Sequence, residues 1–263
     1  MEKEICLIEC IFGRNYTDVY QAPFKEHSFL FSNNKKLKTK VEKFGWKFVF
    51  IDMPLSKDFA MSSFQSKYVK FLQFLKEDRF SGFFDYKYIL YSDHKHNITK
   101  DDIYKLLEMS NKPMLVRNYM NNQRHLWTEI YTSMNQARYL RYMPQTIDWV
   151  REKIKQGYED NPPIFLTGLF LYDISSDNKS KLFNFVDETY CALTTIGTSQ
   201  CQIICSMIAQ KYYDVIQIAD YESIDIKNHT PRSGILKIAK KYLSKNTILA
   251  LRKWRNKIQI ISR

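Results

Sequence analysis

The chain has 263 residues, of which 44% are hydrophobic and 26% are charged, and its formal net charge is +12. This is the composition of a folded globular protein and argues against general disorder. Glycine occurs only seven times and neither GxGxxG nor GxxxxGK[ST] is present, which argues against the glycine-rich phosphate loops of the common nucleotide-binding folds.

Short apolar runs that end at turn residues predict strands. They cover residues 4–11, 27–31, 46–52, 86–91, 113–117, 164–173 and 215–219. Apolar residues at helical spacing predict helices at 67–75, 125–142, 147–156, 183–194 and 202–213. A capping signature at residues 99–102 opens a further helix. Because strands alternate with helices, we expect one α/β domain over residues 1–231, with a mainly parallel, Rossmann-like sheet covered on both faces.

The C-terminal segment, residues 232–263, carries ten Lys and Arg and no acid, so 12 − 10 leaves only +2 for the rest of the chain. Apolar residues recur at helical spacing between these cations, from Ile235 to Trp254. The pattern predicts a basic amphipathic helical tail at an anionic membrane surface. One alternative is a helix docked on its own domain. The other is a nucleic-acid-binding tail, against which the small charge of residues 1–231 argues.

The five cysteines lie in apolar segments without CxxC spacing, at Cys6, Cys10, Cys191, Cys201 and Cys205. We expect reduced thiols of a cytoplasmic protein, with no disulfide or zinc site. The N-terminal residues lack the pattern of a signal peptide, and no run approaches the 18 apolar residues of a membrane span. Neither export nor a spanning helix is therefore expected.

The most polar strand end is the segment from Asp93 to Asn97, which follows an apolar run. Ligands of open α/β sheets bind beyond the carboxyl ends of strands, where an aspartate can hold a divalent ion or a ribose hydroxyl. His94, Lys95 and His96 add further ligands or cationic charge. The alternative is an ordinary polar turn in which Asp93 caps a helix.

YKYILYSDHKHNIT resembles the central motif of GT-A glycosyltransferases, an apolar strand that ends in Asp-x-Asp. The chain is more narrowly similar to glycosyltransferase-like proteins of bacterial polysaccharide loci and plant Golgi enzymes. GRNYTDVY, FLFSNN, GWKFVFID, SKYVKFL, LTGLFLYDIS and QCQIICSMIAQKY follow in the family's order, over roughly residues 4 to 230. The resemblance implies a single GT-A domain that uses a nucleotide-sugar donor.

The resemblance also implies a donor site. Its nucleotide and diphosphate part would comprise Gly13, Asn15, Tyr16, Phe31, Ser32, Asn33, Lys67, Lys70 and Asp93. Its sugar and acceptor part would comprise Thr167, Gly168, Ser199, Gln200 and Gln202.

This chain departs from the motif because Lys95 stands in place of the second acid. Two interpretations follow. In one, Lys95 neutralises the leaving diphosphate and the enzyme works without metal. In the other, Asp93 and His94 or His96, with His229 from the segment after the last strand, hold Mn²⁺ or Mg²⁺.

The general base is not evident from the sequence. Glu129 is the first candidate, because it lies near His125 and Trp127 and aromatic rings stack on sugars; the alternative is a solvated helix position. Asp187 is the second candidate and Glu188 a weaker one. Arg138 and Arg141, three residues apart, either hold an acidic acceptor or lie on the surface.

We therefore predict a cytoplasmic enzyme, peripheral at the inner membrane, of the hexosyltransferase type. It transfers a sugar to a lipid-linked or surface polysaccharide acceptor in lipopolysaccharide or capsule biosynthesis. The predicted partners are a nucleotide sugar and a glycolipid or polysaccharide, without nucleic acid. The alternatives are a sugar-phosphate or phosphotransferase of the same biosynthesis and a non-enzymatic nucleic-acid-binding protein.

Overall fold

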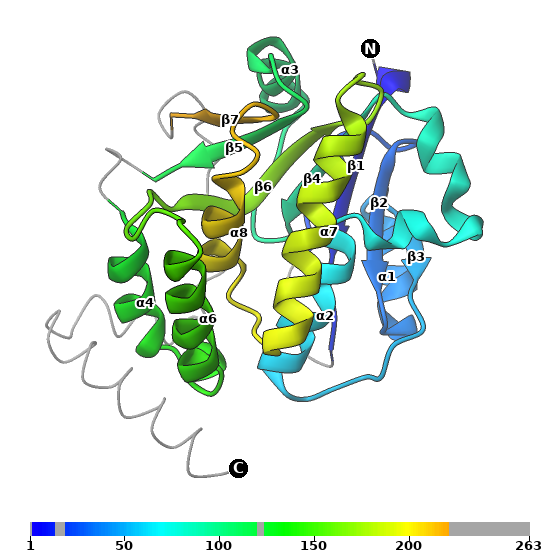
Figure 1. The fold of residues 1–263 in the computed structure, drawn as a ribbon. Helices are drawn as coiled ribbons and strands as arrows, with labels where there is room; N and C mark the ends of the chain where they lie inside the picture. Colours follow the sequence, from blue (N-terminus) through cyan, green and yellow to red (C-terminus); the bar gives the residue numbers. More distant parts are fainter. Residues whose placement is uncertain (1, 14–18, 120–123, 221–263) are drawn as a thin grey trace, which may run out of the picture.

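The computed structural model describes residues 2–13, 19–119 and 124–220. Within these residues, seven strands form one sheet in the order β3-β2-β1-β4-β6-β5-β7 (Figure 1). The strands are β1 (Ile5–Cys10), β2 (Ser28–Ser32), β3 (Lys47–Phe50), β4 (Tyr88–Asp93), β5 (Met114–Asn118), β6 (Phe165–Asp173) and β7 (Ile216–Ala219). All pairings are parallel except those of β6 with β4 and β5. The predicted mainly parallel α/β sheet is confirmed.

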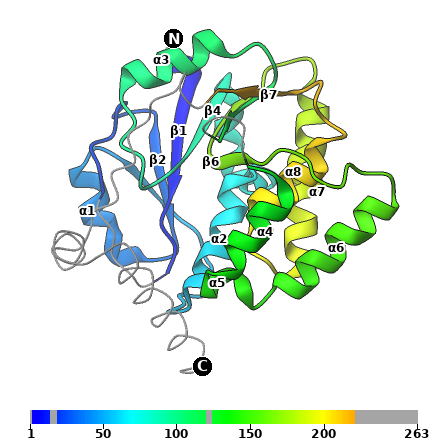
Figure 2. The same ribbon diagram turned by 90° about the vertical axis from the view of Figure 1, so that its left-hand side faces the viewer.

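Helices cover both faces of this sheet (Figure 2). They are α1 (Lys38–Lys43), α2 (Phe59–Lys70), α3 (Lys100–Met109), α4 (Leu126–Met134), α5 (Ala137–Leu140), α6 (Met143–Lys155), α7 (Lys179–Ile196) and α8 (Cys201–Ala209). Short 3-10 helices are η1 (Glu2–Glu4), η2 (Lys35–Leu37), η3 (Gln73–Lys76) and η4 (Asp78–Asp85). α1 and α3 lie on one face, and α2, α7 and α8 lie on the other. None of the described helices is both long and apolar enough to cross a bilayer.

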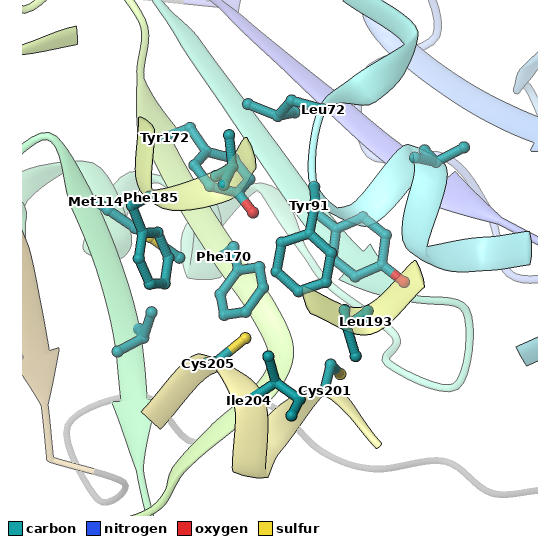
Figure 3. Close-up of a cluster of buried hydrophobic side chains, with 14 of the residues drawn as sticks. Leu72, Tyr91, Met114, Phe170, Tyr172, Phe185, Leu193, Cys201, Ile204 and Cys205 are labelled. Atoms are coloured by element: carbon teal, nitrogen blue, oxygen red, sulfur yellow. The ribbon is translucent and has the colours of Figure 1, made fainter. Parts of the chain in front are cut away.

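Two hydrophobic cores, one on each face, explain why β1 is buried along its whole length. Its side chains alternate, so that Cys6 and Ile8 belong to one core and Ile5 and Leu7 to the other. In the larger core, side chains of β4, β5 and β6 meet those of α7 and α8 (Figure 3). Near-continuous apolar strands are typical of parallel sheets with helices on both faces.

Local signals fixed several element boundaries. The Thr99 hydroxyl accepts from the Asp102 amide while the Asp102 carboxylate accepts from the Thr99 amide, so the predicted capping box opens α3. Gly197, at φ 76°, ends α7 in the left-handed conformation that glycine adopts without strain.

The helix predictions were wrong in their bounds: those at 147–156, 183–194 and 202–213 each differ by four residues at one end from α6, α7 and α8, and two differ more. The predicted helix at 67–75 is instead the end of α2, which begins at an Asp58 cap and stops at Lys70. Leu72 lies at φ 52°, because Phe71 turns back to pack on Phe170 of the core. The predicted helix at 125–142 is two helices, α4 and α5, with a break at Asn135 and Gln136. The predicted domain boundary and the basic tail lie outside the described residues.

Candidate functional site

A cavity of about 580 Å³ lies where β1 and β4 end. The two strands pair in parallel, with Cys10 opposite Asp93, and the residues that follow each strand line the cavity. β2 lies on the other side of β1, so the strand order changes direction between β1 and β4. Open α/β sheets bind ligands at such a switch point. The cavity volume is within the range of small-molecule sites.

Segments that are distant in the sequence complete the lining. α2 contributes Phe59, Ser62, Ser63, Ser66, Lys67 and Lys70. Their spacing of three or four positions means that one face of α2 points into the cavity. The other elements contribute Arg117 of β5 and Tyr119 just after it, Arg138 and Tyr139 of α5, Thr167 and Gly168 of β6, and Gln200, Cys201 and Gln202 at the start of α8.

The described lining is strongly basic. It contains five cationic side chains, Lys67, Lys70, Lys95, Arg117 and Arg138. Asp93 is the single carboxylate among the described lining residues, so five cations against one anion leave a net charge of +4. A concave, low-dielectric site of one sign concentrates ligands of the opposite sign. The cavity is therefore suited to an anion.

Asp93 lies at the centre of this charge. Its Oδ1 is 3.1 Å from the Lys70 ammonium and accepts a 2.9 Å hydrogen bond from the Tyr91 hydroxyl, and its Oδ2 is 3.5 Å from the Lys95 ammonium. Burial raises the pKa of Asp93, but Lys70 and Lys95 outweigh burial and hold the pKa well below its usual range. The same pairing raises the pKa of Lys70 against the effect of burial. Both groups are therefore charged at neutral pH.

Lys67 is also buried, with 5% of its surface exposed, but it has no hydrogen-bond or ion-pair partner among the residues that the structure describes. Burial lowers its pKa; Cys201 and Asp93 oppose this effect, whereas Lys70 and Arg138 add to it, and the pKa stays lowered. A buried cation that is not hydrogen-bonded to a counter-ion costs free energy, which a bound anion recovers. An anion in the cavity would therefore stabilise the charged form of Lys67.

The described donors do not fit Mn²⁺ or Mg²⁺. These ions take several oxygen ligands, whereas both oxygens of Asp93 already contact ammonium groups. No three His, Cys, Asp or Glu side chains of the described segments gather closely enough to hold a metal ion. His94 lines the cavity, but His229 lies outside the described residues, so the three-ligand site stays a prediction.

His96 lies between the end of β4 and the cavity. Its Nδ1 lies 3.2 Å from the Ser92 hydroxyl, and the ring is buried beside Gly168.

The pairing of β5 with β6 is irregular near Gly168, since Val116 lies opposite Phe170 but Arg117 lies opposite Leu166. Thr167 and Gly168 therefore have no partner in β5, and both line the cavity. β-bulges are common near active sites.

Gly168→Ala is expected to lower the free energy of unfolding by about 1–3 kcal/mol and to reduce ligand binding. A Cβ at this position would lie 2.8 Å from His96 Cε1 and 3.2 Å from Asp93 Oδ2, so the buried His96 ring and the Asp93 carboxylate have to move. Urea unfolding measures the loss. The matched control is Gly82→Ala, because a Cβ at Gly82 meets no atom within 4 Å. Equal stability of the two variants would contradict the expectation.

His96 makes stability sensitive to acid. Burial lowers its pKa from 6.5 to about 3, so below pH 6.5 the unfolded chain binds a proton that the folded chain does not. The free energy of unfolding therefore falls as the pH falls, by about 2.5 kcal/mol between pH 7 and pH 4.5. Urea titrations at several pH values should show a shallower fall for His96→Asn. Parallel curves for the two proteins would show that His96 is not responsible.

The predicted nucleotide-binding residues lie at the ends of β1 and β2. The Gly13 amide donates a 2.9 Å hydrogen bond to Asn33 Oδ1, and Asn33 donates to Gln65 and to the Pro54 carbonyl. Gly13 is at φ 93°, and a Cβ there would lie 2.2 Å from the Ser62 hydroxyl, so the turn requires glycine. Ser32 is buried, and its hydroxyl accepts a 3.0 Å hydrogen bond from the Asn34 amide.

None of Gly13, Ser32 and Asn33 lines the described part of the cavity, although Ser62 does. Phe31, also predicted beside the nucleotide, is buried in the core against Phe74. Asn15 and Tyr16 lie outside the described residues.

The structure brings most of the predicted diphosphate and sugar residues together. Those that line the cavity are Lys67, Lys70, Asp93, Lys95, Thr167, Gly168, Gln200 and Gln202. Ser199 is buried and does not line it. Gln202 donates a 2.8 Å hydrogen bond to the Tyr119 hydroxyl, which fixes both side chains at the wall.

The two predicted catalytic acids lie outside the lining. Glu129 is buried, with its Oε2 2.7 Å from Arg124 Nε and its Oε1 accepting from Gln200 at 2.7 Å. It therefore holds Gln200 at the cavity wall. Asp187 is half-exposed on α7, where it pairs with Lys76 and accepts from Gln73. Among the described residues, Asp93 is the one acid that lines the cavity.

Several lining side chains were not predicted, among them Arg117 and Cys201. Arg117 follows the apolar residues of β5 and is buried, and a charge at such a position is itself a signal of a site. Arg138 was predicted only as one alternative, a contact to an acidic acceptor; its guanidinium lies over the Phe59 ring and bonds to Gln136. Cys201 gave no signal, because a cysteine in an apolar helix reads as core.

No family model matches the chain, and no curated protein sequence does. Solved structures match at low identity. A glycosyltransferase involved in the glycosylation of the major capsid of PBCV-1 is 11% identical, with 96% of this chain and 99% of that chain covered and a TM-score of 0.41. The mannosyltransferase Ktr4p from S. cerevisiae is 12% identical, with 84% and 69% covered and a TM-score of 0.36. At such identities, the function of this chain has to come from its own residues.

Proposed function

We propose that this chain is a glycosyltransferase that binds a nucleoside-diphosphate sugar in the basic cavity and transfers the sugar, a hexose, to a hydroxyl acceptor. The observation that carries the proposal is the net charge of +4 around a cavity at the sheet's switch point. A diphosphate carries about two negative charges and offers oxygens to several donors. The motif order along the sequence, which resembles GT-A enzymes, supports the same class of ligand.

The buried lysines account for the chemistry that such a transfer needs. As the bond from sugar to phosphate breaks, negative charge develops on the leaving nucleoside diphosphate. Preorganised cations in a site shielded from water stabilise this charge at little reorganisation cost. Lys70 is fixed by Asp93, and Lys67 is held in the wall without a partner among the described residues. In this proposal the lysine ammonium groups neutralise the diphosphate, as a metal ion held by the second acid of the Asp-x-Asp motif would.

The acceptor hydroxyl must also lose its proton. His94 and His96 are the described lining groups that can accept it, whereas Asp93 suits this role less, because its ion pairs hold its pKa well below the usual range. Burial lowers the pKa of each histidine, so both imidazoles are neutral at pH 7. Glu129 acts in this proposal as a positioning residue for Gln200 rather than as the base, because it does not line the cavity.

The acceptor that we propose is a lipid-linked or surface polysaccharide, as in lipopolysaccharide or capsule biosynthesis. The support for it is the basic tail of residues 232–263. Such a segment attracts anionic membrane surfaces, where a lipid-linked acceptor is found. In this proposal the enzyme is cytoplasmic and peripheral at the inner membrane. Removal of residues 235–263 should then abolish sedimentation with anionic vesicles while leaving nucleotide-sugar hydrolysis intact.

A panel of nucleoside-diphosphate sugars, assayed with the full chain in chelator and in Mn²⁺, tests the proposed function. We expect one donor to raise the melting temperature, to be hydrolysed slowly, and to release a nucleoside diphosphate. Release of a nucleoside monophosphate instead would identify a sugar-phosphate transferase. Absence of any thermal shift with the donors and with free nucleoside diphosphates, at low salt, would overturn the proposal.

A further inference from the structure

Cys201 is a nucleophilic side chain in the cavity wall that the proposed transfer does not use. It is the first residue of α8, lines the cavity, and is 4% exposed. Its Sγ lies 3.1 Å from the Thr167 hydroxyl, which also lines the cavity. In Figure 3 the side chain lies at the start of α8, with Cys205 one turn further along the helix.

The surroundings of Cys201 favour the thiolate. Lys67 and Lys70 line the same cavity, and the amides at the start of α8 add positive potential. Burial raises the pKa of the thiol, but the two lysines outweigh it, and the pKa is lowered although Asp93 opposes them. The Thr167 hydroxyl acts in the same direction as the lysines. Lys67, buried and without a partner in the described part of the chain, is the largest of these favourable influences.

The other four cysteines differ and serve as internal references. Cys10 also lines the cavity, but burial raises its pKa to about 11, and its Sγ contacts the Tyr91 hydroxyl. Cys6 and Cys205 are fully buried, and their pKa values are raised well above the ordinary range by burial. Cys191 is exposed on α7. Among the five cysteines, only Cys201 both lines the cavity and has cationic neighbours whose effect on the thiol pKa exceeds that of burial.

We propose that Cys201 is a covalent modification site within the basic cavity. Its sulfur reacts with small electrophiles that enter the cavity, in particular low-molecular-weight disulfides, and the adduct excludes the diphosphate ligand. In this exchange the Cys201 sulfur attacks one sulfur of the disulfide, a new S–S bond forms and the old one breaks. The departing thiolate takes up the proton that Cys201 lost, so the balance is one disulfide and one thiol on each side. The exclusion of ligand rests on the proposed function; the reactivity of Cys201 does not.

Alkylation of the native full chain tests the reactivity. Labelling with iodoacetamide and, separately, iodoacetate at pH 7, followed by peptide mass mapping, gives a rate for each cysteine. We expect Cys201 to react faster than exposed Cys191, and the ratio of iodoacetate to iodoacetamide rates to be larger at Cys201, because the cavity attracts the anion. Lack of labelling at Cys201 while Cys191 reacts would overturn the proposal.

Variants of Lys67 show whether the reactivity of Cys201 comes from the nearby positive charge or only from its access to the cavity. Lys67→Gln is expected to slow alkylation of Cys201 about threefold for each unit by which the thiol pKa rises, because higher nucleophilicity partly offsets the smaller thiolate fraction. Lys67→Arg keeps the charge and should keep the rate, and Cys191 should react equally in both variants. An unchanged Cys201 rate in folded Lys67→Gln would contradict the proposed role of the cation.

Bis(2-hydroxyethyl) disulfide and UDP test the exclusion of ligand. The disulfide should abolish UDP binding by the wild type and by Cys191→Ser, and dithiothreitol should restore it. UDP binding by Cys201→Ser should resist the disulfide. If Cys201 forms the adduct but UDP still binds, the exclusion is wrong and the modification site stands. If neither form binds UDP or any other nucleoside diphosphate of the panel, but Cys201 reacts as expected, the proposed function fails and the thiol's reactivity remains.

Discussion

Replacing Asp93 with Asn is expected to lower the free energy of unfolding by about 3 kcal/mol, the lower end of the cost of breaking a buried ion pair. The loss arises chiefly at Lys70, whose side chain is 3% exposed and whose ammonium lies 3.1 Å from the Asp93 carboxylate. Without that carboxylate a buried charge is left uncompensated. Ligand binding should fall as well, because Lys70 loses the contact that fixes it. Urea unfolding and binding of a nucleoside diphosphate, measured below the unfolding transition, give the two effects.

Two further variants show whether the buried charge is the cause. Asp93→Asn combined with Lys70→Met removes both charges, and should recover part of the stability that Asp93→Asn alone loses. Lys95→Ala breaks the other ion pair of Asp93, in which the lysine is 44% exposed, and should cost less than about 1 kcal/mol. If Lys95→Ala lowered the free energy of unfolding as much as Asp93→Asn, the burial of Lys70 would not explain the loss in Asp93→Asn.

The sequence predicted the strands well because their apolar runs are buried on both faces. β1, β4 and β6 lie within a few residues of the predicted ranges, and the Thr99 capping box starts α3 as expected. The periodicity around residue 70 failed for a physical reason. Tyr68, Phe71, Leu72 and Leu75 have helical spacing, but the packing of Phe71 and Phe74 on the core turns the chain after Lys70. Tertiary packing overrides such local patterns.

The antiparallel direction of β6 could not be predicted from its composition. Residues 165–173 are apolar, like the parallel strands, and nothing local distinguishes the two directions. The direction matters for the site, because the irregular pairing of β6 with β5 brings Thr167 and Gly168 to the cavity. These two residues were predicted only through the resemblance, without a geometric reason.

The position of Asp93 in the site could be predicted from the sequence, but most of the other cavity-lining residues could not. Asp93 follows a buried strand, and such strand ends meet at the ligand edge of a parallel sheet. Lys67 and Lys70 came from the resemblance; their burial beside Asp93 depends on how α2 packs on the sheet. Glu129 was not predictable in this way: its aromatic neighbours suggested a sugar site, whereas in the fold Glu129 lies outside the lining and pairs with Arg124 and Gln200.

Replacing Lys67 with Gln is expected to change stability and function in opposite directions. The side chain is buried without a partner in the described segments, so loss of its charge should raise the free energy of unfolding by about 1 kcal/mol. Binding of a nucleoside diphosphate should weaken by about 2 kcal/mol, roughly thirtyfold, because a charge-assisted contact is lost. Calorimetric titration and urea unfolding of the same preparation measure both changes.

Lys67→Arg and pH provide the matched controls. Arginine keeps the charge, so affinity should fall much less than in Lys67→Gln, while the gain in stability should disappear. Because burial lowers the pKa of Lys67, the folded chain releases this proton at lower pH than the unfolded chain does. The destabilising contribution of Lys67 should therefore diminish as the pH rises from the lowered pKa toward its ordinary value of 10.5. A Lys67→Gln protein that is less stable than the wild type, yet binds the diphosphate normally, would show that Lys67 is a structural residue and not the site's anion-binding group.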